Sequence, residues 1–313
     1  MAAGGRAFVG SLDRTAVWIA LGVGLALLLR APWFDAPLGR DEGGVALVAR
    51  NWHGGGPFAY GSWFLDRPPL LPALYRLAGD SVTGIRVLGA VAASLLVVIT
   101  TLLAVRIGGR RAAPWAAVIS AVTASSYAIR SVFTPAELLA AVPSSASVLV
   151  LLVGLERRRL WLFACAGALA GAALLVKQSF GDALVAGAVA IAAAKFIGAG
   201  WRETLRRAAA YLAGVAAAAI ALLVWASVEH VSPGAVWYAM FGFRLDAVSA
   251  LSGPQAEGKL LGLWPALRSS GLVIALLLAV VGISKLRAGA TARVVLAAWL
   301  VAAVIGIVLG GSY

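Results

Sequence analysis

Charged residues and cysteine are scarce in this chain of 313 residues. Only 12% of the residues are charged, 62% are apolar, and the mean hydropathy is +0.94. Soluble domains contain about 25% charged residues, so the composition excludes an ordinary soluble domain and indicates an integral membrane protein. The single Cys165 excludes an intramolecular disulfide, and its apolar surroundings are typical of a small core or lipid-facing residue.

The motifs of several function classes are also missing. The chain has two histidines and one cysteine, so there is no His/Cys cluster with zinc spacing, and no Gly-rich phosphate loop follows a predicted strand. The 36 glycines are scattered among alanine and leucine, as in helices that pack closely in lipid. The histidines, His53 and His230, are expected to be ordinary loop residues.

Charge-free apolar runs predict an all-α, polytopic helix bundle. A spanning helix needs about 20 mostly apolar residues. The first run, 15–29, is followed by Arg30 rather than by a small-residue cleavage site, so we expect a retained first helix. The sixth run is short, and extending it places Asp182 and Lys195 at its two ends. About nine spans are expected from the runs 15–29, 87–105, 112–129, 138–155, 160–176, 183–194, 208–228, 269–284 and 294–313.

The net charge of +13 is divided unequally between alternate connecting segments. With a cytoplasmic N-terminus, the cytoplasmic segments carry 15 basic and 3 acidic residues, and the outer segments carry 11 basic and 10 acidic residues. Cytoplasmic loops are enriched in Lys and Arg, so this excess predicts an orientation and not a nucleic-acid partner. We therefore expect a multi-pass plasma (inner) membrane protein. Residues 1–313 would form one domain with long outer loops at 31–86 and 229–268.

The strongest functional signal is a polar segment in the first outer loop. Asp41 and Glu42 are adjacent carboxylates, and Asp66 and Arg67 precede a double proline about 25 residues later. Charged groups near a bilayer are costly unless they face water, pair with each other or take part in function. This segment is therefore the first candidate for a functional site.

Two amphipathic surface helices are predicted in the same outer loop. Apolar residues recur with helical spacing in 45–52 and again in 71–78, so we expect both helices to lie along the membrane surface. The segment Gly54-Gly55-Gly56-Pro57 between them predicts a turn or hinge. The aromatic residues of the loop either form an interfacial belt or line a sugar or lipid groove; they are Trp33, Phe34, Trp52, Phe58, Tyr60, Trp63 and Phe64.

The order of these residues carries a family resemblance. The Asp-Glu pair follows the first predicted span, Ala46-x-x-Ala49-Arg50 and the aromatic patch come next, and Arg67-Pro68-Pro69-Leu70 follows. This order resembles the GT-C class of polytopic glycosyltransferases, in its aminoarabinose-transferase-like and protein-mannosyltransferase-like branch (glycosyltransferase family 39 type). The resemblance is strongest over 38–90. It implies a helical bundle with an outer-face cavity, surface helices in the first outer loop and a polyprenyl-phosphate sugar donor.

The same resemblance implies catalytic residues. Asp41 stands at the position of the essential acidic residue of the family, with Glu42 beside it. Glu137 stands at the outer start of the fourth helix, where a second acidic residue, more often Asp, is expected. We therefore expect Asp41, Glu42 and Glu137 to be catalytic, and any divalent cation (Mg or Mn) to be held by Asp41 and Glu137. Members usually continue past this length, which implies a short member or a C-terminally truncated sequence.

Three basic residues are candidates for binding the donor phosphate: Arg67, Lys177 and Arg244. Fixed positive charge stabilises the negative charge that develops on a leaving phosphate. Arg67 stands where many family members have lysine, and Lys177 ends an apolar run on the outer side, against the inside-positive bias. Structural alternatives remain open, because Arg67 can pair with Asp66, Lys177 can reach the membrane interface and Arg244 can pair with Asp246.

The predicted function is an inverting transfer of a sugar from a polyprenyl-phosphate donor to a lipid, glycan or protein acceptor on the outer face. The expected partners are this donor and membrane lipids, without nucleic acid. Two alternatives are a transporter or flippase of a lipid-linked precursor and a non-catalytic GT-C-like lipid-binding protein. Transporters often contain inverted repeats and charges near the midplane, whereas this chain has no such repeat and its charges cluster at predicted helix ends.

Overall fold

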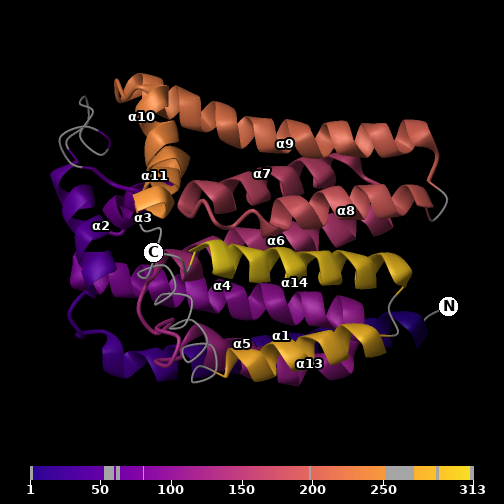
Figure 1. Ribbon diagram of the computed structural model, residues 1–313. Coiled ribbons are helices and arrows are strands. Elements are labelled where there is room, and N and C mark those ends of the chain that lie inside the picture. The colour runs from indigo at the N-terminus through magenta and orange to yellow at the C-terminus, as the bar shows by residue number, and fades with distance from the viewer. Residues whose placement is uncertain are drawn as a thin grey trace.

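The structure, a computed structural model, describes residues 3–52, 60, 64–79, 81–196, 199–250, 271–286 and 289–310. All regular elements in these residues are helical, which confirms the predicted all-α, polytopic bundle. The longer helices run roughly parallel to one another (Figure 1). They are α1 (Ala3–Arg30), α4 (Val82–Gly108), α5 (Ala113–Ala124), α6 (Ala136–Arg157), α7 (Leu160–Val176), α8 (Asp182–Phe196), α9 (Trp201–Val228), α13 (Leu272–Lys285) and α14 (Ala290–Gly310).

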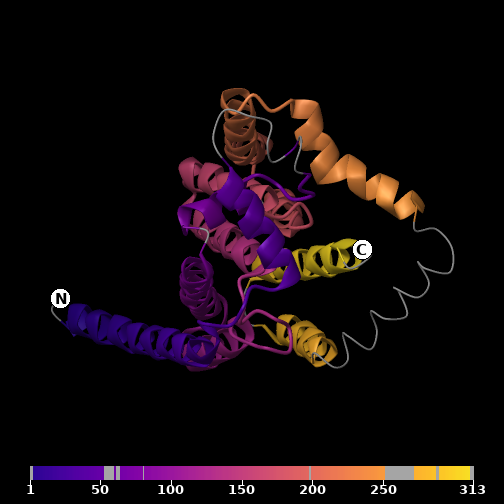
Figure 2. The ribbon, with the colours of Figure 1, turned by 90° about the vertical axis from the view of Figure 1, so that its left-hand side faces the viewer.

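Shorter helices gather at one end of the bundle, which faces the viewer in Figure 2. We call it the capped end. A 3-10 turn at Ala31–Trp33 continues α1 there, and a π-helical turn at Tyr238–Gly242 joins two of the short helices. The short helices are α2 (Arg40–Asn51), α3 (Leu70–Leu77), α10 (Pro233–Trp237) and α11 (Phe243–Ala250).

Five helical segments among the described residues are long and apolar enough to cross a membrane. The other predicted runs contain the shorter helices α5, α7, α8 and α13, which lie alongside the longer ones (Figure 1). Each of the predicted runs therefore contains a helix, although only some helices have the full length of a span. The five segments are Arg14–Trp33, Val82–Gly108, Ala136–Arg157, Trp201–Val228 and Ala290–Ile307.

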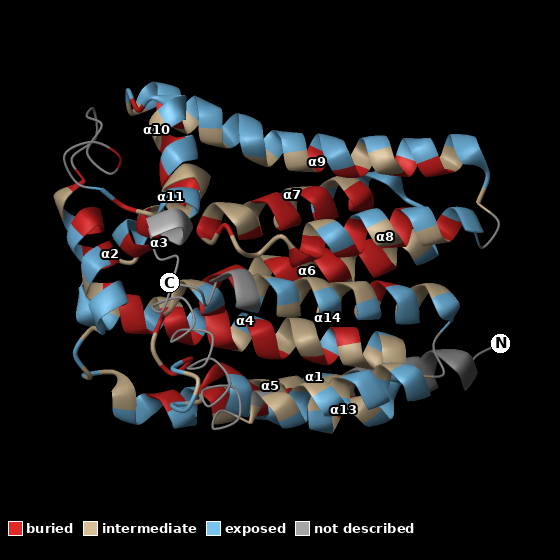
Figure 3. Cartoon of the chain, viewed as in Figure 1, coloured by how far each residue is buried: buried red, intermediate tan, exposed pale blue. Residues whose placement is uncertain are grey.

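The core of the bundle lies around α4, α6 and α7. Helix α4 packs against α1, α5 and α6, while α7 packs between α6 and α9, and α8 packs against α14. Buried residues concentrate in α4, α6 and α7, whereas α9 and α13 are mainly exposed along their lengths (Figure 3). Apolar side chains on such exposed helices suit contact with lipid, so the burial pattern agrees with a membrane-embedded bundle.

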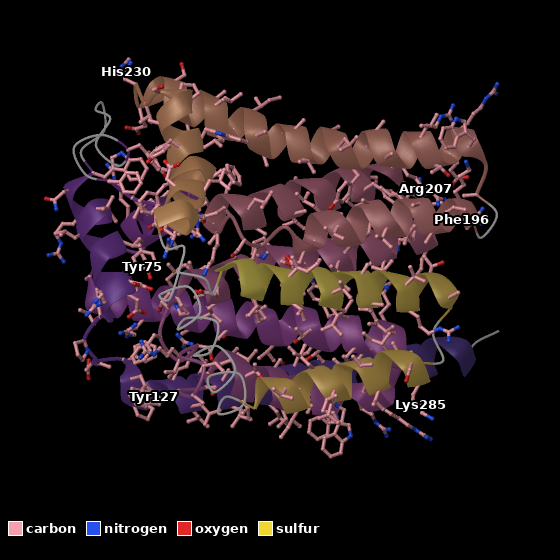
Figure 4. All side chains as sticks on the ribbon, in the orientation of Figure 1. Tyr75, Tyr127, Phe196, Arg207, His230 and Lys285 are labelled. Atoms are coloured by element: carbon pink, nitrogen blue, oxygen red, sulfur yellow. The ribbon has the colours of Figure 1, made fainter. Side chains whose placement is uncertain are left out.

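The two ends of the bundle differ in charge. Tyr75, Tyr127 and His230 lie at the capped end, and Arg207, Phe196 and Lys285 lie at the opposite end (Figure 4). Alternate connections return to the same end, so the segments rich in Lys and Arg share the end of Arg207. The structure therefore separates a basic end from an end with nearly balanced charges.

The predicted outer loops are largely helical. Both predicted helices are present as α2 and α3, and their apolar faces pack on the protein core. Val45, Val48, Leu71 and Tyr75 are buried there, because the ends of the neighbouring long helices offer a closer apolar surface. The segment 233–250 contains α10 and α11 rather than a loop. The Gly-rich turn at 54–57 and residues 251–268 lie outside the described residues.

Candidate active site

A cavity of about 600 Å³ opens at the capped end of the bundle. This volume lies within the usual range for small-molecule sites, about 300–1,000 Å³. Its walls come from the start of α2, the segment before α3, α3 itself, the α5–α6 connection, the start of α6 and the residue after α7. The lining residues are Gly39, Arg40, Asp41, Glu42, Val45, Arg67, Leu71, Tyr75, Arg130, Phe133, Pro135, Ala136, Glu137 and Lys177.

Five of the six residues predicted from the sequence line this cavity. Asp41, Glu42, Arg67, Glu137 and Lys177 come from separate segments of the chain and meet there. Arg244, the sixth predicted residue, is not among the lining residues and lies beside Asp66, which is described below. The fold therefore gathers the predicted carboxylates and two of the predicted phosphate ligands in one place.

The carboxylate of Asp41 is exposed in the first turn of α2. Asp41 lines the cavity, and within the described part of the chain it forms no hydrogen bond and no ion pair. The amino-terminal end of a helix dipole favours a negative charge at this position. Asp41 is therefore the acidic side chain of the cavity wall that has no cationic partner among the described residues.

Glu42, one residue later, has a buried carboxylate with several partners. Its Oε1 accepts hydrogen bonds from Arg86 Nη1 and from the backbone N–H of Thr134, each at 2.6 Å. Its Oε2 accepts from the N–H of Gly39 at 2.9 Å, which helps to begin α2. These contacts join α2, α4 and the α5–α6 connection. The catalytic role predicted for Glu42 stays a prediction, while its contacts are those of a structural residue.

Two buried arginines support the loops around the cavity. Arg86 also donates to the carbonyl oxygens of Ala36 and Pro37, at 3.1 and 3.0 Å, and so holds the approach to α2. Arg30 donates to three carbonyl oxygens of the α5–α6 region. Neither role was predicted from the sequence, because an arginine at the end of an apolar run usually indicates a membrane interface. The acceptors of Arg30 are Ala124, Ser131 and Phe133.

Tyr75 and Thr134 connect α3, α4 and the α5–α6 connection. The hydroxyl of Tyr75 donates to the carbonyl oxygen of Thr134 at 2.6 Å. The hydroxyl of Thr134 in turn donates to the carbonyl oxygen of Ile85 at 2.8 Å. Burial, and then the charge of Glu42, raise the pKa of Tyr75 above its ordinary value. The hydroxyl therefore stays protonated at neutral pH and continues to donate this hydrogen bond.

Glu137 and Lys177 form an ion pair on the cavity wall. Glu137 stands in the first turn of α6 and its side chain is 58% exposed, whereas the side chain of Lys177, just after α7, is 12% exposed. The two predicted residues are therefore partners. Because an exposed carboxylate is stabilised by water, Lys177 can exchange this partner for another anion at low cost.

Asp66 organises the basic residues beside the cavity. Its carboxylate pairs with Arg67, as in the structural alternative considered from the sequence, and lies 3.9 Å from Arg244 Nη2. Its backbone carbonyl accepts from Gln178 Nε2 at 2.9 Å. The buried hydroxyl of Tyr60 donates to the carbonyl oxygen of Arg67 at 2.7 Å, which holds the Arg67 backbone in place. Asp66 thus links the segment before α3, which carries Arg67, with α11, which carries Arg244.

Two further arginines on the cavity wall were not predicted. Arg40 precedes Asp41 and Arg130 lies in the α5–α6 connection with a left-handed backbone, φ 56°. An aromatic group stands next to Arg130: Trp33 stacks on Tyr127 with ring centroids 4.7 Å apart, and Phe133 meets Trp33 edge-on. No sequence pattern marked Arg130, because only the folded chain brings it to the cavity.

The cavity has an excess of positive charge. Four cationic side chains and three carboxylates line it, and the buried Arg86 neutralises the carboxylate of Glu42. A concave site with this balance favours an anionic ligand. Within the described residues no group of three or more His, Cys, Asp or Glu side chains gathers to hold a metal ion, and the divalent cation at Asp41 and Glu137 stays a prediction.

An apolar helical bundle with this mixed-charge cavity at one end defines the class of protein, a membrane glycosyltransferase of the GT-C type. The chain matches the family described as dolichyl-phosphate-mannose-protein mannosyltransferase over residues 66–225, about half of its length, and belongs to this family. The matched range contains Arg67, Glu137 and Lys177, and it begins after Asp41. No curated protein and no solved structure matches the chain.

Proposed function

We propose that the protein transfers a sugar from a polyprenyl-phosphate donor to an acceptor hydroxyl or amine at the capped end of the bundle, on the outer face of the membrane. The proposal is supported by the family, whose description names a lipid-phosphate-linked sugar, and by the cationic cavity. The free carboxylate of Asp41 is the observation that carries it. The other two carboxylates on the cavity wall are paired with basic side chains, Glu42 with Arg86 and Glu137 with Lys177.

The chemistry is a single displacement with inversion at the anomeric carbon. The acceptor atom forms a bond to this carbon, and the bond from the carbon to the phosphate oxygen breaks with its electron pair leaving on the phosphate. The acceptor proton passes to Asp41, which acts as the general base. Asp41 suits this role because it lines the cavity and has no competing partner in the described part of the chain.

The leaving phosphate needs fixed positive charge on the other side of the reacting carbon. Arg67 and Lys177 supply it from the cavity wall, and Arg244 supports Arg67 through their shared neighbour Asp66. Binding of the phosphate draws Lys177 away from Glu137, and the exposed Glu137 carboxylate is then solvated. Glu42 acts as a positioning residue that holds Asp41 at the start of α2.

The substitution Asp41→Asn tests this proposal. It keeps the size of the side chain and removes the base, so we expect sugar transfer from a labelled polyprenyl-phosphate sugar to fall by about 100-fold or more. Binding of the donor should change little, since the asparagine carries no charge that the phosphate would need. The measurement is the rate of transfer by the purified protein in lipid nanodiscs.

A matched control is Asp35→Asn, which removes another exposed carboxylate of the same outer segment without touching the cavity. This variant should transfer sugar at the rate of the unmodified protein. Unchanged transfer by the Asp41→Asn variant, with correct membrane insertion, would show that Asp41 is not the base.

A further inference from the structure

The turn between α7 and α8 presents Lys177 to the cavity and is held from three sides. The N–H of Phe180 donates to the carbonyl oxygen of Lys177 at 3.0 Å, which closes the turn. Gln178 ties it to the first outer segment through its hydrogen bond to Asp66. Asp182, at the start of α8, ties it to α6 and, unexpectedly, to the distant helix α14.

The contact with α14 is a part-buried hydrogen bond between two side chains. Trp299 Nε1 donates to Asp182 Oδ2 at 2.6 Å, and the hydroxyl of Ser144 donates to the same oxygen at 3.0 Å. Asp182 is 7% exposed and forms no ion pair within the described residues. Its other oxygen, Oδ1, is buried without a hydrogen-bond partner among the described residues, so losing one donor to Oδ2 leaves the buried carboxyl group poorly satisfied.

A second contact from α14 reaches the same turn. Gly306 lies seven residues after Trp299, on the same face of the helix, and a Cβ placed there would lie 2.8 Å from the carbonyl oxygen of Ser179. Val295, one turn before Trp299, is fully buried and continues this face. Helix α14 thus lies along α8 and touches the turn at Ser179 and Asp182 (Figure 1).

We infer that Trp299 and Gly306 are positioning residues for Lys177, so that α14 helps to form the phosphate subsite without entering the cavity. This inference rests on the phosphate-binding role proposed for Lys177. Helix α14 lies outside the part of the chain that matches the family. Displacing α14 moves the turn, and Lys177 then no longer meets the phosphate in the right place.

The test is a double-mutant cycle read by binding of farnesyl phosphate to the purified protein. Trp299→Phe removes the indole N–H, and we expect it to weaken binding about 5- to 10-fold. Lys177→Gln should weaken it about 10-fold or more. In the Lys177→Gln background the change at Trp299 should add less than about a 2-fold loss, because its effect passes through Lys177. Equal losses in both backgrounds would overturn the inference.

Two further variants distinguish a specific effect on Lys177 from a general effect on folding. Trp161→Phe makes the same substitution on α7, at a side chain that is 62% exposed, and should leave binding unchanged. Gly306→Ala pushes on the turn from α14 while keeping Trp299, and should also weaken binding in the presence of Lys177 but not in its absence. If Trp299→Phe fails to fold, the double-mutant cycle is measured with Gly306→Ala in its place.

Hydrogen exchange of the backbone amides in 178–182 separates this inference from the proposed function. We expect faster exchange in Trp299→Phe than in Trp161→Phe. Suppose that Trp299→Phe changes neither exchange nor binding, while Lys177→Gln weakens binding. This result would overturn the inference and leave the proposed function unaffected. Unchanged binding in Lys177→Gln with faster exchange in Trp299→Phe would refute the role of Lys177 and still support α14 as the holder of the turn.

Discussion

At the scale of single residues, the carboxylates around the cavity differ by their partners. Asp41 has no partner among the described residues. Glu137 shares an exposed ion pair with Lys177, and Glu42 is buried against Arg86. A buried ion pair adds little net stability by itself, but removing one partner leaves the other charge buried and uncompensated. Neighbouring residues in the sequence, Asp41 and Glu42, therefore have separate roles.

The substitution Glu42→Gln should destabilise the protein strongly. It keeps the shape of the side chain but leaves Arg86 without a counter-ion, at a cost of about 3–5 kcal/mol. We expect the midpoint of thermal unfolding in detergent to fall by several degrees, as measured by the loss of monodisperse protein after heating. Glu156→Gln is the control, because Glu156 pairs with Arg106 at the surface, where a pair contributes about 0–1 kcal/mol. Equal losses from both substitutions would contradict this assignment.

At the scale of elements, small residues let α7 and α9 approach closely. A Cβ at Gly214 would overlap the backbone carbonyl of Ala164, and a Cβ at Gly167 would overlap that of Tyr211. Apolar side chains gain little from leaving lipid for a helix interface, so close backbone packing provides much of the attraction between membrane helices. The α7–α9 pair therefore depends on the absence of side chains at these two positions.

Gly214→Ala tests this close approach. The added methyl group forces α9 away from α7, and overpacking of this kind costs about 1–3 kcal/mol. The same thermal assay should show a clear loss of stability. The control is Gly24→Ala in α1, where no atom lies within 4 Å of the new Cβ and where alanine favours the helix slightly. A Gly214→Ala variant as stable as the Gly24→Ala variant would contradict the packing argument.

At the scale of the whole molecule, the bundle has a cavity at one end and most of its positive charge at the other. From the inside-positive rule we propose that the basic end lies in the cytoplasm and the cavity outside. The capped end would then meet lipid-linked donors and acceptors on the outer face, and the long helices would hold the site at the membrane surface.

Cysteine labelling tests this orientation. In a Cys165→Ala background, Asp35→Cys places a thiol at the capped end, and Phe196→Cys places one at the basic end, where Phe196 is 87% exposed (Figure 4). On intact cells a membrane-impermeant maleimide should label only the first variant, and inside-out vesicles should reverse the result. Labelling of only the Phe196→Cys variant on intact cells would reverse the proposed orientation.

The amino-acid sequence by itself determined the class of fold and much of the site. Apolar runs, helical spacing in 45–52 and 71–78 and the Lys and Arg distribution are local or additive properties, so they can be read without knowing the packing. The same applies to Asp41, Arg67 and Lys177, which stand out because charge near a bilayer is costly, whereas Glu137 was predicted from the family resemblance.

Only the tertiary structure decided which residues meet. It buried Glu42 against Arg86, brought Arg130 to the cavity wall and placed Trp299 against Asp182. It also turned the apolar faces of α2 and α3 toward the bundle core. These outcomes depend on contacts between segments far apart in the chain, and a side chain's hydrogen-bond partner is set by such packing and not by its sequence neighbours.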